Sequence, residues 1–249
     1  MEGLTRAELQ AMLKEIDTNY AQFNLPEIEP IYIDGKLANK KAIDEKLKTF
    51  ATLLSALWLA NKLIIDKYSK RTMFTVINYY TAKKQLKGYS TTEITNTMWN
   101  SIIDKTMLKR AKKVQIKQVI NGNSRRLNKR LQKTVKTMYA NGKSKPQIAK
   151  ELQKQLGYNK KKAKSIAITE VNYYKSEAQL QATKDVPVKK TWIHNGSREP
   201  RASHLSANGQ VADKDGYFNI GGNLTKAPQH FGLPSEDINC RCGMRIDII

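Results

Sequence analysis

The chain has 249 residues, of which 40% are hydrophobic, 13 are glycine and 7 are proline. This length suits one large domain or two ordinary ones, and the low glycine and proline content excludes a collagen-like chain and argues against a loop-rich sandwich. The formal net charge of +22 indicates an anionic partner.

Residues 1–35 form an acidic segment with a net charge of −5. We expect a short helix followed by an extended arm, because Pro26, Pro30 and Gly35 interrupt helical structure near its end. Such an arm could pack on its own chain or on a neighbouring molecule.

A helix is predicted from Lys36 to Lys70. Its apolar residues recur three and four positions apart, and Asn61 interrupts them; they are Ile43, Leu47, Phe50, Leu54, Leu57 and Ile64. This stripe suits either a coiled-coil-like pair or burial within the chain's own domain. The apolar run Leu53–Ile65 is too short to span a bilayer.

Residues 36–140 are predicted to be a basic helical body. From Lys105 to Lys164 there are 20 lysines and arginines and one acidic residue, Glu151. Like charges at this density repel one another unless an anion lies alongside, so we expect sequence-independent contact with the phosphates of double-stranded DNA. The alternative is a basic face that only keeps the protein soluble. The expected contact residues are Lys109, Arg110, Lys112, Lys113, Arg125, Arg126, Lys129, Arg130, Lys160, Lys161 and Lys162.

Further helices are predicted along this body and beyond it. A capping box, Ser90–Glu93, begins one and Ser124 another, while Ser144 begins a helix that closes near Gly157. A last helix runs from about Lys161 to Thr183. Because the segment after Gly142 resembles the first helix of a helix-turn-helix, a cytoplasmic DNA-binding regulator is an alternative function.

After Asp185 the pattern changes to short extended pieces separated by Asn-Gly, Gly-Gly and Pro. One strand is expected around Val188–Trp192, Gly221-Gly222 forms a turn, and MRIDII is the closing strand. The fold class is therefore mainly α with a small C-terminal α+β domain, that is, an elongated helical body followed by an irregular β-containing cap. The predicted divisions are 1–35, 36–140 and 141–249, with helices to about residue 185.

All three histidines and both cysteines lie in the last 60 residues. His204, Cys240 and Cys242 are candidate zinc ligands, because alternate residues of an extended Cys-x-Cys segment point to one face. Burial of both cysteines as small apolar residues is the alternative. A zinc-dependent nuclease or toxin-like effector would draw on Asp213, Asp215, His204 and His230, although no nuclease spacing is met.

The order of motifs in residues 140–249 resembles the Mu F-like minor head proteins of tailed phages, also called the phage head morphogenesis family. The Thr-Glu pair, R-x-x-H and N-C-R-C are its hallmarks. The matching residues are Ile166–Glu170, Lys190–Trp192, Arg198, Arg201–His204, Asn208-Gly209, Phe218, Pro228, Pro234 and Ile238–Cys242. Ser197 stands where the family commonly has an acidic residue, which puts a shared carboxylate role there in doubt.

The resemblance implies a non-enzymatic minor capsid component, located in the virion inside the capsid near the portal and in the host cytoplasm during assembly. Its implied partners are the portal protein, packaged double-stranded DNA, and a scaffold or major capsid protein; self-association is a further option, and no small-molecule substrate is expected. Some relatives are thought to leave the virion with the DNA. In this interpretation a structural clasp pins the last strand to the cap, with or without zinc; its residues are Glu170, Trp192, Arg201, His204, Cys240, Arg241 and Cys242.

Overall fold

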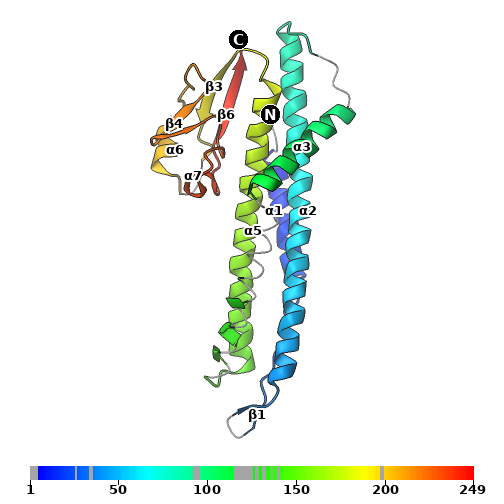
Figure 1. Ribbon diagram of the computed structural model, residues 1–249. Helices are drawn as coiled ribbons and strands as arrows, with labels where there is room; N and C mark the ends of the chain where they lie inside the picture. The colour runs from blue at the N-terminus through cyan, green and yellow to red at the C-terminus, as the bar shows by residue number, and fades with distance from the viewer. Residues whose placement is uncertain are drawn as a thin grey trace. The chain divides into compact units, whose positions relative to one another are not determined.

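The computed structural model describes residues 5–25, 27–33, 36–91, 96–114, 126, 129–130, 133–135, 137–138, 141–196 and 199–249. Long helices precede a few short antiparallel strands near the C-terminus (Figure 1), which confirms the predicted fold class. The chain forms two compact units. Unit 1 comprises Met1–Leu13, Ile65–Thr106 and Lys164–Ile249, and unit 2 comprises Lys14–Ile64 and Met107–Ala163.

Helix α1 (Arg6–Ala21) begins with a capping box. The backbone N–H of Thr5 donates to the Glu8 carboxylate at 2.8 Å, and the N–H of Glu8 donates to the Thr5 hydroxyl at 3.1 Å. These two bonds satisfy N–H groups that a helix start would otherwise leave unpaired. Glu8 also forms an ion pair with Arg71 at 2.7 Å within unit 1.

The acidic arm that follows α1 packs on its own chain within unit 2. Ile28 is buried, and Lys145 lies 3.5 Å from Glu27 and 3.8 Å from Glu29. The arm ends in two short antiparallel strands of two residues each, β1 (Tyr32–Ile33) and β2 (Lys36–Leu37). Part of the basic surface therefore receives its counter-charge from the N-terminal segment of the same molecule.

Helix α2 (Lys40–Leu86) is longer than predicted, with 47 residues. The five apolar positions from Ile43 to Leu57 are all buried, so this stripe serves the interior of unit 2 rather than a partner helix. Asn61 is also buried and accepts a hydrogen bond from Asn19 at 3.1 Å. The next buried residue is Ile65, not the expected Ile64.

Part of α2 is apolar enough to qualify as a membrane span. An 18-residue window of the helix has a mean hydropathy of 1.2, and 33% of that window is buried inside the protein. Core helices of globular proteins meet the same criterion. At its end, Gly88 adopts φ +78°, and the N–H groups of Gly88 and Tyr89 donate to the carbonyls of Gln85 and Lys84, a Schellman motif.

Helix α3 (Asn96–Val114) follows, with Ile103 buried and Asp104 paired with Lys70 at 2.7 Å in unit 1. The predicted capping residues Thr92 and Glu93, and most of the helix predicted from Ser124, lie outside the described residues.

Helix α5 (Lys145–Ala182) is one continuous helix of 38 residues. The predicted break at Gly157 is therefore wrong. A glycine inside a helix costs about 1 kcal/mol relative to alanine, which neighbouring apolar contacts can offset. Because α5 continues through this position, no short turn leads to a recognition helix, which removes the basis for the helix-turn-helix interpretation.

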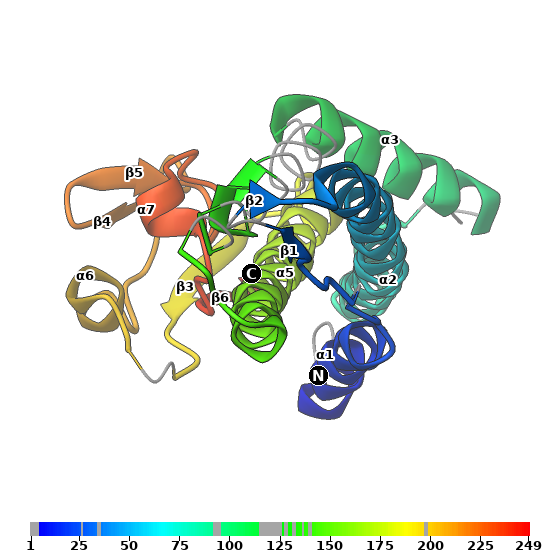
Figure 2. The ribbon, with the colours of Figure 1, turned by 90° about the horizontal axis from the view of Figure 1, so that it is seen from below.

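The cap in unit 1 is built around strands β3 (Val188–Ile193) and β6 (Gly243–Ile248), which pair antiparallel with Trp192 opposite Met244. The hairpin β4 (Phe218–Ile220) and β5 (Asn223–Thr225), turned at Gly221-Gly222, and the short helices α6 (Ala202–Ser206) and α7 (Pro234–Asp237) complete it. Figures 1 and 2 show β3 and β6 between these elements and the C-terminal turns of α5. Both predicted strands are confirmed.

Candidate functional site

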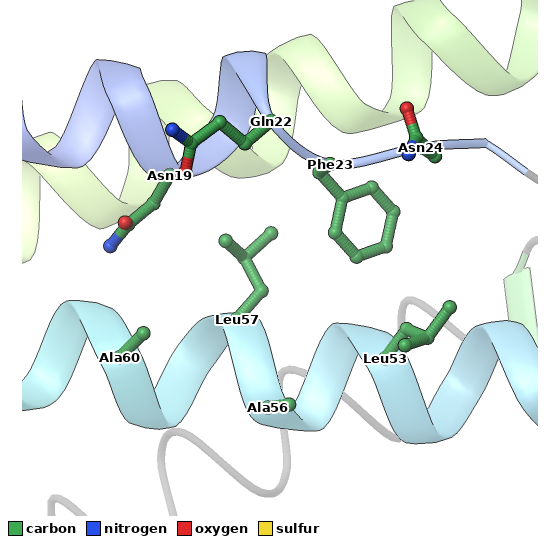
Figure 3. Close-up of a pocket in the computed structure, with 8 residues that line it drawn as sticks. All are labelled: Asn19, Gln22, Phe23, Asn24, Leu53, Ala56, Leu57 and Ala60. Carbon is green, nitrogen blue, oxygen red and sulfur yellow. The ribbon is translucent and has the colours of Figure 1, made fainter.

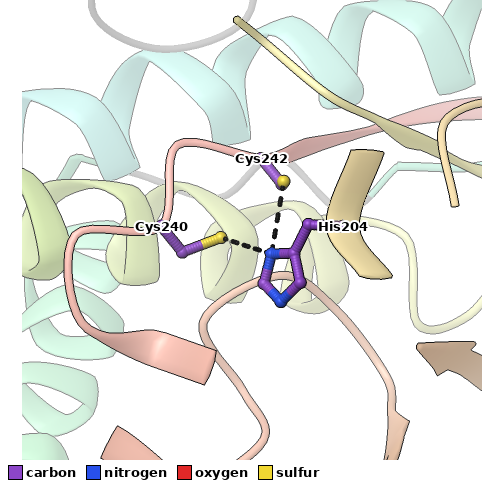
Figure 4. Close-up of side chains that lie close together, drawn as sticks. All are labelled: His204, Cys240 and Cys242. Atoms are coloured by element: carbon purple, nitrogen blue, oxygen red, sulfur yellow. Dashed lines mark hydrogen bonds between the residues drawn. The ribbon is translucent and has the colours of Figure 1, made fainter. Parts of the chain in front are cut away.

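One histidine and both cysteines converge in the interior of the cap. Helix α6 carries His204, and the segment between α7 and β6 carries Cys240 and Cys242. The Nδ1 atom of His204 lies 3.4 Å from the Cys240 sulfur and 3.6 Å from the Cys242 sulfur (Figure 4). All three side chains are at least 95% buried. Within the described part of the chain, this is the one group of His, Cys, Asp and Glu side chains arranged to hold a metal ion.

A carboxylate contacts the edge of the His204 ring that lies opposite the two cysteines. Its Nε2 atom lies 2.8 Å from an oxygen of Glu236, a residue of α7 that is largely buried. This contact orients the imidazole so that Nδ1 faces the two sulfurs.

Polar side chains fix the backbone of the cysteine segment. The Gln229 amide donates to the carbonyls of Cys240 at 3.1 Å and Cys242 at 3.0 Å, and Asn172 of α5 donates to the Cys240 carbonyl at 3.1 Å. The N–H of Asn239 donates to the Thr169 hydroxyl at 2.8 Å. The helix residues around the Thr-Glu pair therefore position the segment that bears both thiols.

Trp192 forms the apolar wall of the cluster. Its ring is fully buried and packs edge-on against His204 and Phe218, with centroid distances of 5.7 and 5.3 Å. Its indole N–H has no hydrogen-bond partner within the described part of the chain. Its proximity lowers the pKa of the Cys242 thiol against larger opposing effects.

The two thiols have very different acidities. The hydrogen bond from Cys242, reinforced by His204, lowers the pKa of the Cys240 thiol to about 4 despite burial. The same bond, together with burial, raises the pKa of the Cys242 thiol. Hydrogen bonding to Cys240, and secondarily to Glu236, raises the pKa of His204.

The structure brings most of the expected clasp residues to this region. Arg201, next to α6, donates to the Ile238 carbonyl at 2.8 Å, which ties α6 to the start of the cysteine segment. Glu170 is buried near the end of the Thr-Glu motif, and Arg241 is exposed between the two buried cysteines. Arg198, one of the residues that match the family, lies outside the described residues.

The residues nominated for a nuclease are not brought together. Asp213 lies in an exposed turn where its carboxylate accepts from the N–H groups of Asp215 and Tyr217. His230 is bonded to Glu177 at 2.9 Å and to the Pro228 carbonyl. Because His204 is buried among sulfurs, a nucleic acid phosphate cannot reach it.

Two residues of the site were not anticipated from the sequence. Glu236 lies 32 positions from its partner His204, and Gln229 lies 11 and 13 positions from its partners Cys240 and Cys242. Neither residue belongs to a local motif. Lys190, a residue of β3 that matches the family, is buried and donates to the Gly216 and Lys226 carbonyls. Lys190 therefore links two backbone segments inside the cap and is not part of a basic surface.

The expected DNA-contacting residues are mostly exposed where they are described. Arg126, Lys129, Arg130, Lys161 and Lys162 are on the surface or near it, as is Lys109 of α3. Lys160 is half-exposed and lies 3.5 Å from Asp17. The side chains of Lys112 and Lys113, and all of Arg125, lie outside the described residues.

A hollow of about 380 Å³ lies in unit 2 between the end of α1 and the middle of α2 (Figure 3). Phe23 and Leu57 point into it, and amides from Asn19, Gln22 and Asn24 border it. None of its lining side chains is titratable, so the hollow offers no acid–base chemistry.

Comparison with known proteins places the family domain over the second half of the chain. The family described as "Phage Mu protein F like protein" matches residues 129–245. The NAD(+)--arginine ADP-ribosyltransferase EFV of Enterococcus faecalis is 32% identical over 106 residues, 41% of this chain and 22% of that protein. Minor head protein GP7 of Bacillus phage SPP1 is 30% identical over 103 residues, 39% of this chain and 33% of that protein. No solved structure gives a significant match.

Proposed function

Because residues 129–245 match the Mu F-like family and a phage minor head protein is similar over 103 residues, we propose that this chain is a minor head protein located inside the capsid near the portal. The observation that carries this proposal is the family domain, which includes the buried cap and the ordered motifs that hold it together. The head protein GP7 is 30% identical to this chain over 103 residues, which supports a virion component.

We propose that unit 2 contacts the packaged DNA through phosphates. Its support is the excess of basic over acidic residues between Lys105 and Lys164, together with the exposure of most of the expected contact residues that the structure describes. Neutralising several phosphates releases counterions, so affinity should fall by orders of magnitude as salt rises.

Partners other than DNA would meet other surfaces. The predicted apolar stripe of α2 is buried and is not available to a portal or a second copy. Leu59 and Leu63, four positions apart on the same helix, are 58% and 62% exposed and supply apolar contact area on one face instead. We propose that this exposed apolar face of α2 attaches the chain to the portal, to a scaffold or major capsid protein, or to a second copy.

The match to an ADP-ribosyltransferase does not lead us to propose that activity. Its 106 matched residues are 22% of that protein, and their length is close to that of the family domain. We propose that this chain binds without turnover.

Duplex binding and turnover are measured on the purified chain. Fluorescence anisotropy with a random duplex should show strong binding at low salt and the same affinity for unrelated sequences. Metal-dependent plasmid cleavage that His204→Ala abolishes would instead establish a nuclease, and transfer of ADP-ribose from NAD to an arginine analogue would establish the transferase. Absence of duplex binding at low ionic strength would contradict the DNA proposal.

A further inference from the structure

We propose that His204, Cys240 and Cys242 bind a zinc ion that fastens the cysteine segment to helix α6 inside the cap. The three ligand atoms lie within 4.8 Å of one another and all three side chains are buried. This inference does not depend on the proposed virion role, because it concerns the internal structure of the cap.

The spacing of the ligand atoms fits zinc. Zinc bonds of about 2.3 Å to sulfur and about 2.0 Å to nitrogen, at a tetrahedral angle, place sulfur and nitrogen about 3.5 Å apart. The observed separations from His204 Nδ1 are 3.4 and 3.6 Å.

A hydrogen-bonded cluster explains the geometry less completely. Each imidazole nitrogen has either one hydrogen or one lone pair, so Nδ1 cannot form two good hydrogen bonds at once. Both sulfurs nevertheless approach this single atom from different sides (Figure 4). A cation between the three atoms would satisfy all of them.

The surroundings supply the outer shell that metal-binding histidines and thiolates usually have. Glu236 on Nε2 of His204 fixes the tautomer that leaves the Nδ1 lone pair free. The Trp192 N–H, for which the described residues supply no hydrogen-bond partner, is available to a thiolate at Cys242. Gln229 holds both cysteine carbonyls, which fixes the two sulfurs relative to each other.

The ligand types select zinc over harder cations, because two thiolates and one imidazole disfavour magnesium and calcium. No fourth His, Cys, Asp or Glu joins the three in the part of the chain that the structure describes. The fourth position therefore falls to a water molecule or a backbone oxygen. Because the ligands are shielded from solvent, the ion would be structural.

The order Cys240, His204 and Glu236 also resembles a nucleophile, base and carboxylate. A nucleophile must meet its substrate, whereas Cys240 is 2% exposed and shares the imidazole nitrogen with Cys242. The geometry therefore favours a metal site over a catalytic thiol.

Metal content of the full-length chain tests this inference. Protein purified without chelators should contain one zinc per chain by inductively coupled plasma mass spectrometry. After zinc removal, added cobalt(II) should produce the d–d bands of a tetrahedral ion and thiolate charge-transfer absorption. Glu236→Gln should keep the stoichiometry and weaken affinity about 10- to 100-fold.

His230 provides a matched control, because it is a largely buried cap histidine whose ring nitrogens are bonded to a carboxylate and a backbone carbonyl rather than to sulfur. His204→Ala should lose zinc, and His230→Ala should retain it. Zinc-free wild-type protein that binds no cobalt would overturn the proposal, as would equal zinc loss in the two variants. The wild-type cobalt spectrum decides the question even if His204→Ala fails to fold, which circular dichroism would reveal.

Discussion

The Glu236 carboxylate lies 2.8 Å from Nε2 of His204, while the Nδ1 atom of the same ring faces both cysteine sulfurs. Three separate pieces of the cap, α6, α7 and the segment before β6, therefore meet at one imidazole. Removal of any one of these interactions should loosen the attachment of the last strand.

Glu236→Ala should destabilise the protein by about 1–3 kcal/mol, because it leaves a polar atom of the buried His204 ring without a partner. Urea unfolding at constant zinc concentration measures the change. Glu199→Ala, which removes an exposed carboxylate near the same region, serves as control and should change stability by less than about 0.5 kcal/mol. Equal effects of the two variants would show that the Glu236 contact contributes nothing.

Asp185→Asn should destabilise unit 1 by about 1 kcal/mol, because Lys84 is 10% exposed and has this carboxylate 2.5 Å away. Asp185 itself is 58% exposed, so solvent screens the pair and limits its contribution. Asp247→Asn, which breaks an exposed pair with Arg245, is the matched control and should have a smaller effect.

This pair also predicts a pH dependence. The hydrogen bond from Lys84 lowers the pKa of Asp185 below its usual value, so its stabilisation is present above the pKa of the unfolded state and is lost as pH falls through the folded-state pKa. The stability gap between wild type and Asp185→Asn should therefore shrink from about pH 7 to about pH 3. A gap that widens on acidification would contradict this assignment.

Gly157→Ala should stabilise the protein by about 0.5–1 kcal/mol, because Gly157 is inside α5 and an added Cβ meets no atom within 4 Å. Gly221→Ala should have the opposite effect. Gly221 adopts φ +58°, and its Cβ would lie 3.0 Å from the Cβ of Ser203. Thermal unfolding of both variants checks the two signs, and destabilisation by Gly157→Ala would contradict the continuous helix.

Replacing exposed basic residues of unit 2 should weaken DNA binding and flatten its salt dependence. The triple variant with Arg126, Lys129 and Lys161 changed to Gln should reduce the slope of log K against log salt by about 0.9 for each phosphate that the variant no longer neutralises. The same charge change at Lys189, Lys214 and Arg245 in the cap is the control. If the cap variant reduced the slope equally, binding would depend on net charge alone.

The apolar stripe of α2 shows how much of a buried helix face can be predicted from sequence periodicity. Spacings of three and four residues identify the buried face from Ile43 to Leu57 correctly. A straight helix has 3.6 residues per turn and drifts relative to a 3.5-residue repeat, which explains why Ile65 and not Ile64 continues the buried face beyond Asn61. The capping box of Thr5 and Glu8 has the same local character, because its two partners are three residues apart.

Long-range features of the cap are accessible from the sequence only in part. The family hallmarks identify His204, Cys240 and Cys242 because they carry reactive side chains in a fixed order. Glu236 and Gln229 could not be assigned, because their roles depend on how α7 and its preceding loop fold back onto α6. Gly157 misled the prediction because a helix break and a tolerated glycine look alike in one sequence.

The virion role is tested most directly by co-expressing this chain with the portal and major capsid proteins of the same phage. Purified heads are then analysed by quantitative mass spectrometry. The account predicts a few copies of the chain in each portal-containing head and a loss of signal from heads assembled without the portal. Heads that contain the portal but none of this chain would contradict it.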